Sequence, residues 1–522
     1  MAQKPVNFLY FITDQHRADY LGCGGHPVLK TPHIDSIAAG GTRFDRFYVA
    51  NPVCMPNRAA LMTGRMTSIN GVRHNGLPLP SDANTFVDVL RAAGYATALV
   101  GKSHLRTITE IAPLVGANPA GDGGLSEARR SGGDADPVEE PPYWRGRETP
   151  GFPAPYYGFD HVDLVTDHGD QTGGAHLHWL RRKLGDPGRF TGEANQLPHD
   201  YVCPQAVRTA LPEDCYSTSY IRDRAVDWLE SRRGSNQPFF AFVSFPDPHH
   251  PFTPPGRYWD MYDPANMTLP DNFHRHDNPP PTLQWLRREY EAGTRPFMAQ
   301  NAFMADERST REAMALTCGM IAMIDDAVGA VLAKLAEIGR DGDTVVVFNS
   351  DHGDFMGDHG LLLKGPMHFQ PLVRVPFLWK DPQRATVAAT SALASTVDVA
   401  RTILSRAGLT PYNGMQGTDL GDALAGRNGA REAVLIEDDA NKVFLGFDSP
   451  PRLRTLVTER HRLSVYLDAD WGELYDLRDD PLECRNLFDD PAYEKVRATL
   501  MRLLANELMR AADRSPWPRR VA

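Results

Sequence analysis

Three apolar runs constrain the fold of this 522-residue chain more than any other feature. They span residues 6–12, 239–245 and 344–350 and are rich in aromatic and β-branched side chains. Runs that do not alternate with polar residues are typical of strands buried on both faces, and such strands occur mainly in parallel sheets covered by helices. The sequence therefore predicts an α/β fold, with a large, mostly parallel sheet sandwiched by helices.

Polar side chains follow these runs and a further short strand predicted over residues 97–100. In order along the chain they are Asp14, Gln15, Lys102, His104, His249, Asp351 and His352. Ligand sites in open α/β sheets lie beyond the carboxyl ends of the strands, so these residues stand where a metal or substrate site would form. Each has an ordinary alternative when taken singly: a cap or turn for the aspartates, and a solvated side chain for the lysine.

The stretch around Cys54 is predicted to be a loop that becomes a helix. Pro52 and Pro56 indicate that the helix does not run through the cysteine, whereas good helix formers follow from Arg58 until Gly64 ends the segment. Cys54 would then lie beside a helix N-terminus, where the dipole and free N–H groups favour an anion. The alternative is a buried thiol that acts as a small hydrophobic side chain.

The pattern changes after about residue 390, where short strands joined by turns indicate a small antiparallel sheet. We predict a catalytic domain over residues 1–390 and a C-terminal subdomain over 391–522 that ends in a helix. Two irregular insertions, near 116–155 and 247–308, are expected to shape the substrate pocket. A group of histidines between 168 and 178 has no recognisable metal spacing, so we expect it on the surface or in that pocket.

Composition excludes several classes of function. The net charge of −11 argues against a general nucleic-acid binder, although a local cluster of cations can still bind an anionic substrate. The six cysteines form no C-x-x-C pair, which argues against a zinc ribbon. We find no run close to the roughly 18 apolar residues of a membrane span. The first apolar run is too short for a signal peptide, so we expect a cytoplasmic protein without a membrane segment.

Five motifs occur in an order that resembles one known family. They are T-D-Q at 13–15, C-M-P-N-R at 54–58, G-K-S-H at 101–104, P-H-H-P at 248–251 and S-D-H-G-D at 350–354. The chain resembles the formylglycine-dependent sulfatases of the alkaline phosphatase superfamily over about residues 5–490. The resemblance implies an alkaline phosphatase-like fold. It also implies that a formylglycine-generating maturation enzyme oxidises Cys54 to formylglycine, whose hydrated aldehyde attacks a sulfate ester.

The resemblance also implies a set of site residues. One divalent metal ion would be held by Asp14, Gln15, Cys54, Asp351 and His352. The catalytic residues would be Cys54, Arg58, Lys102, His104, His249 and Lys364. Substrate binding would fall to Asn75, Lys102, His249 and Lys364. Oxygen ligands suit Ca²⁺, whereas an imidazole ligand favours an ion such as Mn²⁺.

Phosphonate monoester hydrolases are the main alternative within the superfamily. They share the D-Q and D-H metal pattern and formylglycine, but they carry uncharged residues where this chain has Lys102 and His104. We therefore expect hydrolysis of small-molecule aryl or alkyl sulfate monoesters. Phosphonate monoester or phosphodiester hydrolysis, or promiscuity between these reactions, is the second reading, and an inactive anion-binding protein is the third. The sequence leaves open the alcohol half of the substrate and whether the protein forms a homo-oligomer.

Overall fold

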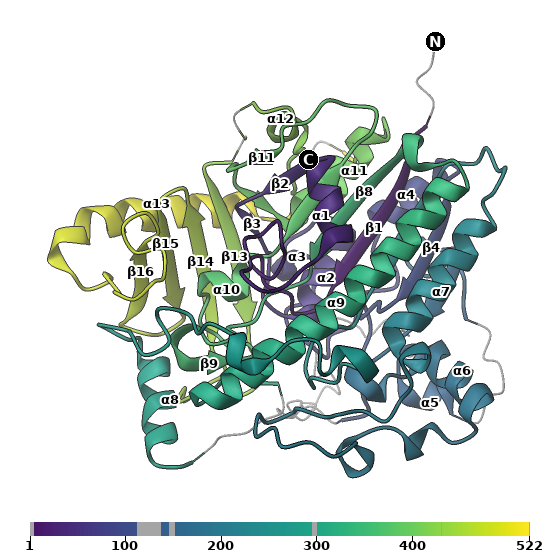
Figure 1. The fold of residues 1–522 in the computed structure, drawn as a ribbon. Helices are drawn as coiled ribbons and strands as arrows, with labels where there is room; N and C mark the ends of the chain where they lie inside the picture. Colours follow the sequence, from purple (N-terminus) through teal and green to yellow (C-terminus); the bar gives the residue numbers. More distant parts are fainter. Residues whose placement is uncertain are drawn as a thin grey trace, which may run out of the picture.

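An eight-stranded sheet forms the centre of the molecule (Figure 1). The computed structural model describes residues 5–111, 137–145, 152–294, 300–427, 429 and 431–520. From one edge to the other, the strands are β11 Ala389–Thr390, β2 Thr42–Phe44, β10 Phe377–Lys380, β8 Thr344–Ser350, β1 Asn7–Thr13, β6 Phe239–Ser244, β4 Ala96–Gly101 and β5 His161–Leu164.

The sheet is mostly parallel, as predicted. Strand β1 pairs in parallel with β6 on one side and β8 on the other, so that Phe8 lies opposite Phe240 and Val345. Only β10 runs against its neighbours β8 and β2 within the described part of this sheet. Every residue of β1, β6 and β8 is buried, which explains why these three runs are apolar without alternation.

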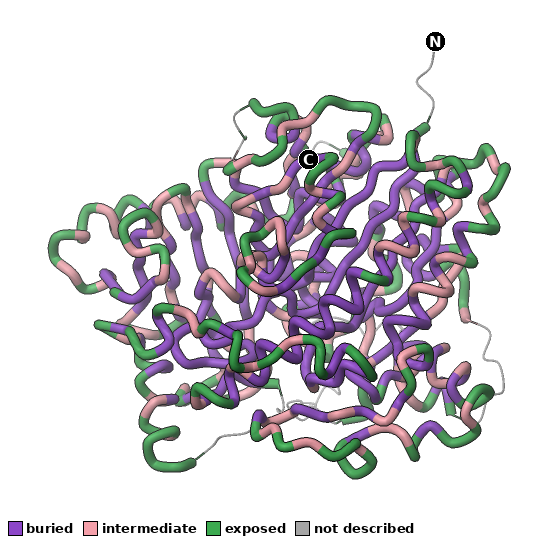
Figure 2. Tube along the Cα trace, in the orientation of Figure 1, coloured by how far each residue is buried: buried purple, intermediate pink, exposed green. Residues whose placement is uncertain are grey.

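Helices cover both faces of the sheet (Figure 1). Leu9 and Phe11 of β1 pack on the face covered by α1, α7 and α9, whereas Phe8 and Tyr10 pack on the face covered by α2, α4 and α11. The bounds are α1 Pro32–Ala39, α7 Ser217–Glu230, α9 Glu307–Glu337, α2 Cys54–Thr63, α4 Phe86–Ala92 and α11 Thr396–Arg406. Figure 2 shows the central strands buried along their length, with exposed residues gathered in the loops and outer helices.

The predicted antiparallel sheet near the C-terminus is also present. Its four strands are β13 Ala433–Asp439, β14 Arg452–Thr458, β15 His461–Tyr466 and β16 Gly472–Asp476, paired in that order. Helix α13, Glu494–Arg510, buries Leu500 and Leu504 against one face of this sheet. The predicted fold class is thereby confirmed in both of its parts.

We predict a boundary between the two domains at residue 390, but the residues that follow it still contact the domain of the large sheet. Strand β12, Ala394–Ser395, pairs with β3, Phe47–Tyr48, and α11 packs against α2. The remaining helices and paired strands are α3 Thr67–Asn70, α5 Pro141–Trp144, α6 Gly174–Leu184, α8 Pro281–Glu291, α10 Gln370–Val373, α12 Gly421–Leu424, β7 Phe303–Met304 and β9 Leu361–Leu362.

The start of helix α2 differs from the prediction. The helix begins at Cys54 itself and not near Arg58, with Val53 as its N-cap. Pro56 falls in the first turn, where a backbone N–H has no partner inside the helix and its loss costs little. The predicted end at Gly64 is confirmed, with this glycine in the left-handed conformation (φ 62°).

Two further expectations need correction. The segment 247–308 is not irregular throughout, because it contains α8; most of the insertion near 116–155 lies outside the described residues. Helix α9 is long and apolar enough by composition to cross a membrane, which the sequence reading missed. In the structure, 78% of its most apolar window is buried inside the protein, where it covers one face of the sheet.

Candidate active site

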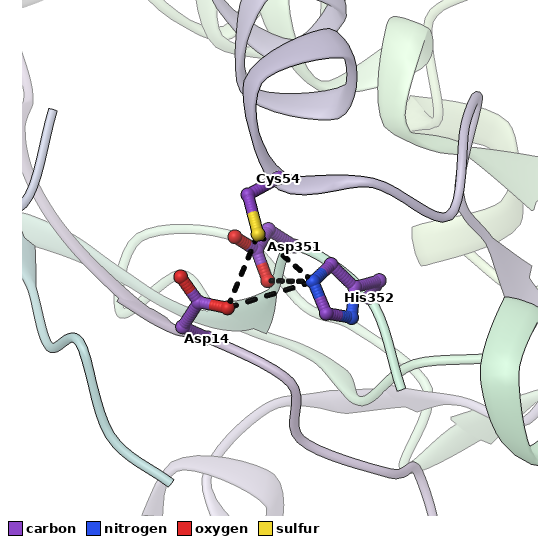
Figure 3. Close-up of side chains that lie close together, drawn as sticks. All are labelled: Asp14, Cys54, Asp351 and His352. Carbon is purple, nitrogen blue, oxygen red and sulfur yellow. Dashed lines mark hydrogen bonds and ion pairs between the residues drawn. The ribbon is translucent and has the colours of Figure 1, made fainter. Parts of the chain in front are cut away.

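Four possible metal-binding side chains meet at the carboxyl edge of the large sheet (Figure 3). Asp14 follows β1 and Asp351 follows β8, and these strands pair directly with Thr13 opposite Ser350. Cys54 comes from the first residue of α2, and its Sγ is 3.1 Å from His352 Nε2 and 3.6 Å from Asp14 Oδ1. One ligand atom from each of the four residues lies within 4.8 Å of the others, and all four residues are buried.

Cationic side chains surround this group. Lys102, which follows β4, contacts Asp14 Oδ2, and Arg58 Nε lies 2.7 Å from Asp351 Oδ2. Lys364 Nζ lies 3.4 Å from Cys54 Sγ and 3.1 Å from His352 Nε2. Three separate segments therefore direct positive charge at one small volume that also contains the thiol.

His249 lies on the Lys364 side of the thiol, with its Nε2 3.0 Å from the lysine Nζ. The P-H-H-P segment that carries it follows β6, the neighbour of β1. His104 is buried close enough to Cys54 for the thiol to affect its protonation. The structure thus brings the predicted catalytic side chains together around Cys54.

The local charges perturb protonation strongly. Burial disfavours a Cys54 thiolate, but Lys364, His352 and Lys102 outweigh it and hold the pKa of the thiol well below its ordinary value. Burial, together with Lys102, lowers the pKa of His104 to about 3, so this imidazole is neutral near pH 7. Cys54 therefore lies where negative charge is favoured, beside a histidine able to accept a proton.

Gln15 provides the best test of whether the site suits a metal ion. Its Nε2 donates to Asp354 Oδ2 and lies 3.0 Å from His250 Nδ1. Its Oε1 is buried and has no hydrogen-bond partner among the residues that the structure describes. A buried oxygen in this condition costs free energy unless it finds a ligand. Two carboxylates, an imidazole and this amide oxygen are donors that fit one divalent ion.

Asn75 has a different place from the one expected for a substrate contact. Its Oδ1 accepts a hydrogen bond from Met55 N at 3.2 Å, in the first turn of α2. It therefore satisfies one of the free N–H groups at the helix start beside Cys54. A direct contact with substrate stays a prediction.

His168 is a member of the site that sequence reasoning did not assign. Its Nε2 lies 2.6 Å from Lys102 Nζ, and its ring stacks on His249 with the centroids 3.7 Å apart. All three histidines that we expected on the surface or in the substrate pocket are buried, and of these His168 lies beside Lys102 and His249. His176 and His178 bind the carbonyl oxygens of Cys215 and Trp144. The sequence signal that could have identified His168 is its position shortly after β5, at the same edge of the sheet as Asp14 and Lys102.

Comparisons with known proteins give matches over most of the chain. The family model described as Sulfatase matches residues 6–143 and 161–409, and one described as N-sulphoglucosamine sulphohydrolase, C-terminal, matches residues 357–510. The chain is 26% identical over 517 residues to the arylsulfatase of Clostridium perfringens (strain 13 / Type A), with 97% of this chain and 94% of that protein covered.

Two further matches are to proteins whose names do not describe them as sulfatases. A multifunctional alkaline phosphatase superfamily protein of Trinickia caryophylli is 27% identical over 527 residues, with 93% of this chain and 92% of that protein covered. The crystal structure of the phosphonate monoester hydrolase of Agrobacterium radiobacter superposes with a TM-score of 0.77 at 26% identity. The superposition covers 98% of this chain and 97% of the hydrolase chain.

Proposed function

The chain belongs to the sulfatase family, whose members hydrolyse sulfuric esters, and we propose that it cleaves small aryl or alkyl sulfate monoesters with a hydrated formylglycine made from Cys54. The observation that carries the proposal is the environment of the Cys54 side chain. Its Sγ has Lys364, His352 and Asp14 as close neighbours, in a buried site that also contains Lys102. A buried nucleophile among cations and metal-binding groups is suited to an anionic ester.

The modification would be installed by a formylglycine-generating maturation enzyme. Once hydrated, formylglycine supplies an oxygen nucleophile for sulfur and a second hydroxyl through which the sulfate can later be released. His104, neutral near pH 7, is the group we assign to hold the proton of that second hydroxyl.

Sulfate binding would fall to Lys102, Lys364 and His249. Because the sulfate oxygens carry negative charge throughout the reaction, fixed ammonium groups in a buried site stabilise them more than they would in water. Arg58 has a supporting role in this proposal. Its ion pair with Asp351 at 2.7 Å orients one metal-binding carboxylate and its 3.5 Å approach to Asp14 constrains the other.

We assign the metal ion to Asp14, Gln15, Asp351 and His352, together with the modified Cys54. The ion would act as a Lewis acid that stabilises negative oxygen near the nucleophile. Ca²⁺ and Mn²⁺ both fit the oxygen donors, and His352 favours Mn²⁺ or a similar transition ion. Asp354 helps to fix the Gln15 amide with its oxygen free to bind.

Hydrolysis of phosphonate monoesters or phosphodiesters is the second candidate. It is supported by Gln15 and His352 at the metal site and by the structural similarity to a phosphonate monoester hydrolase. The sulfatase proposal is favoured by Lys102, a charged residue buried against Asp14. By the family resemblance, phosphonate monoester hydrolases carry uncharged residues in this loop.

The predicted preference for sulfate over phosphonate monoesters is tested with 4-nitrophenyl sulfate and a phosphonate monoester of the same phenol. We expect a higher kcat/KM for the sulfate ester, and a loss of about 10²- to 10³-fold in this activity for Lys102→Ala. A phosphonate monoester preferred by more than about tenfold would reverse the ranking.

A further inference from the structure

A loop from the small C-terminal sheet reaches the active centre. It connects β13 to β14 and comprises residues 440–451. Asn441 Nδ2 donates to the backbone oxygen of Asn75 at 3.2 Å, and the Asn75 side chain accepts from Met55 N, next to Cys54. One end of the loop is therefore fixed beside the first turn of the nucleophile helix.

The same loop is also fixed beside Lys364. Leu445 is packed so closely on Gly365 that a Cβ added at Gly365 would lie 3.2 Å from Leu445 Cδ1. The small sheet makes a second contact in this segment, because the Tyr466 hydroxyl donates to Pro366 O at 2.9 Å. The loop thus lies between the nucleophile helix and the segment that carries Lys364.

Lys442 is the charged residue that this loop brings to the site. It is half-buried, and its Nζ lies 5.4 Å from the centroid of the Phe444 ring. Burial lowers the pKa of its ammonium group, and the nearby charge of Lys364 lowers it further. Lys442 therefore adds positive charge on the side of the site where Lys364 lies.

The structure does not neutralise this charge. No carboxylate among the described residues forms an ion pair with Lys442. The nearest acidic residues in the sequence have other partners: Asp438 lies 3.5 Å from His368 Nε2, and Asp439 lies 2.8 Å from Arg454. Contact with one aromatic ring stabilises the ammonium group only weakly and does not neutralise its charge. A half-buried cation beside a second cation is favourable chiefly when an anion binds there.

We propose that Lys442 binds a second anionic group, a carboxylate or another sulfate, on the alcohol half of the substrate. The inference rests on the proposed function, because the ester sulfate is assigned to Lys102, Lys364 and His249. With those positions occupied by the ester sulfate, Lys442 remains for a negative group farther along the molecule. The substrate class is therefore a sulfate monoester of an alcohol or phenol that itself carries negative charge, and a cationic alcohol is disfavoured.

The test compares phenyl sulfate with 4-carboxyphenyl sulfate and 1,4-phenylene disulfate, using the full-length, modified enzyme. For Lys442→Gln we expect KM for both doubly anionic esters to rise about tenfold, with kcat/KM for phenyl sulfate changed less than about twofold. Lys442→Arg should retain most of the preference because it keeps the charge. Lys495→Gln, an exposed position on α13 in the same part of the molecule, is the matched control and should change none of these values.

An equal loss on all three esters would overturn the inference, because Lys442 would then act on the ester sulfate or on the fold. Unchanged kinetics on all three would overturn it as well. The wild-type reaction with phenyl sulfate separates this failure from failure of the proposed function. If the wild-type enzyme hydrolyses none of the sulfate esters, the proposed function fails and the inference fails with it.

Discussion

Among the residues that the structure describes, two buried clusters of charged side chains differ in how completely they are paired. On the small sheet, the guanidinium group of Arg462 contacts Glu483 through Nε, lies 3.1 Å from Glu473 through Nη2, and donates to Ser464 Oγ at 2.8 Å through Nη1. The arginine has two carboxylates as partners, and each of its nitrogens has an acceptor. The remaining carboxylate oxygens accept from the Tyr466 hydroxyl and from Gln370 N. Such a cluster is complete without any ligand.

The active centre uses similar residue types and leaves them incompletely paired. Gln15 Oε1 has no hydrogen-bond partner within the described part of the chain, and Arg58 Nη2 has only its 3.5 Å ion pair with Asp14 Oδ2. Lys102 and Lys364 are close to nitrogen atoms as well as to acidic groups, at 2.6 Å from His168 Nε2 and 3.0 Å from His249 Nε2. A neutral imidazole nitrogen can accept a hydrogen bond from an ammonium group, but it does not neutralise the positive charge.

The difference separates a structural cluster from a functional one without reference to any motif. Burial and charge are common to both clusters, so neither property identifies the active site. Between these two clusters, the difference is that polar atoms of the active centre lack hydrogen-bond partners, whereas every nitrogen of Arg462 has an acceptor. Mutations in the two clusters should accordingly change different quantities, activity in one and stability in the other.

The largest effect is expected at Cys54. Cys54→Ala and Cys54→Ser should each lose turnover of an aryl sulfate by about 10⁴-fold or more, because alanine has no nucleophile and serine lacks the second hydroxyl of the aldehyde hydrate. Serine has a single hydroxyl, so we expect this variant to take up one sulfate group on prolonged incubation with substrate and to retain it. Intact-protein mass spectrometry detects the added sulfate, and the alanine variant is the control. Turnover near that of the wild type in Cys54→Ser would rule out formylglycine as the essential nucleophile.

The next effect concerns the metal site. Asp351→Ala should remove the bound divalent ion and lower kcat/KM by about 10³-fold or more, because Asp351 is both a proposed metal ligand and the partner of Arg58. Metal content is measured by inductively coupled plasma mass spectrometry after exchange into chelator-treated buffer. A variant that keeps a full complement of metal would show that Asp351 is not a ligand.

The paired cluster should respond in stability and not in activity. Arg462→Met leaves Glu473 and Glu483 buried without their partner, so we expect the free energy of unfolding to fall by about 3–5 kcal/mol. Urea denaturation measures this change. Adding Glu473→Gln and Glu483→Gln to the same variant should recover part of the loss. If Arg462→Met instead abolished activity at unchanged stability, the distinction between the two clusters would be wrong.

A smaller effect on activity is expected at His168. His168→Gln should lower kcat/KM for an aryl sulfate by about 10- to 100-fold with little change in Tm, because this ring supports Lys102 and stacks on His249. His176→Gln is the matched control, since His176 binds the carbonyl oxygen of Cys215 away from the site. His176→Gln should lower Tm more than it lowers kcat/KM. If His168→Gln instead lowered Tm and left kcat/KM unchanged, His168 would not belong to the site.

The sequence predicted those parts of the site that follow directly from strand ends. Asp14 and Asp351 could be placed because apolar runs ending in an acidic residue indicate neighbouring strands of a parallel sheet. The resemblance to sulfatases added Lys364, whose position after a two-residue strand has no local signature. The start of α2 was misjudged because proline is unfavourable inside a helix and yet acceptable in its first turn.

Contacts between distant segments could not be predicted. Arg462 and Glu473 meet through the pairing of β15 with β16, and Glu483 reaches them from a turn beyond that hairpin. Lys442 comes near Lys364 only because the small sheet packs against the larger unit. Periodicity and motif order carry no information about such packing, and the completeness of pairing that separates the two clusters depends on it.

Sulfate ester hydrolysis by formylglycine depends most directly on the chemical state of residue 54. The mass of tryptic peptide 47–58 reports this state. In enzyme that hydrolyses an aryl sulfate, we expect this peptide to carry an aldehyde, with a lower mass than the cysteine form and with reactivity toward hydrazide reagents. Across preparations, the aldehyde fraction should rise in proportion to kcat per mole of protein. A fully active preparation in which peptide 47–58 carries only the thiol would contradict the account.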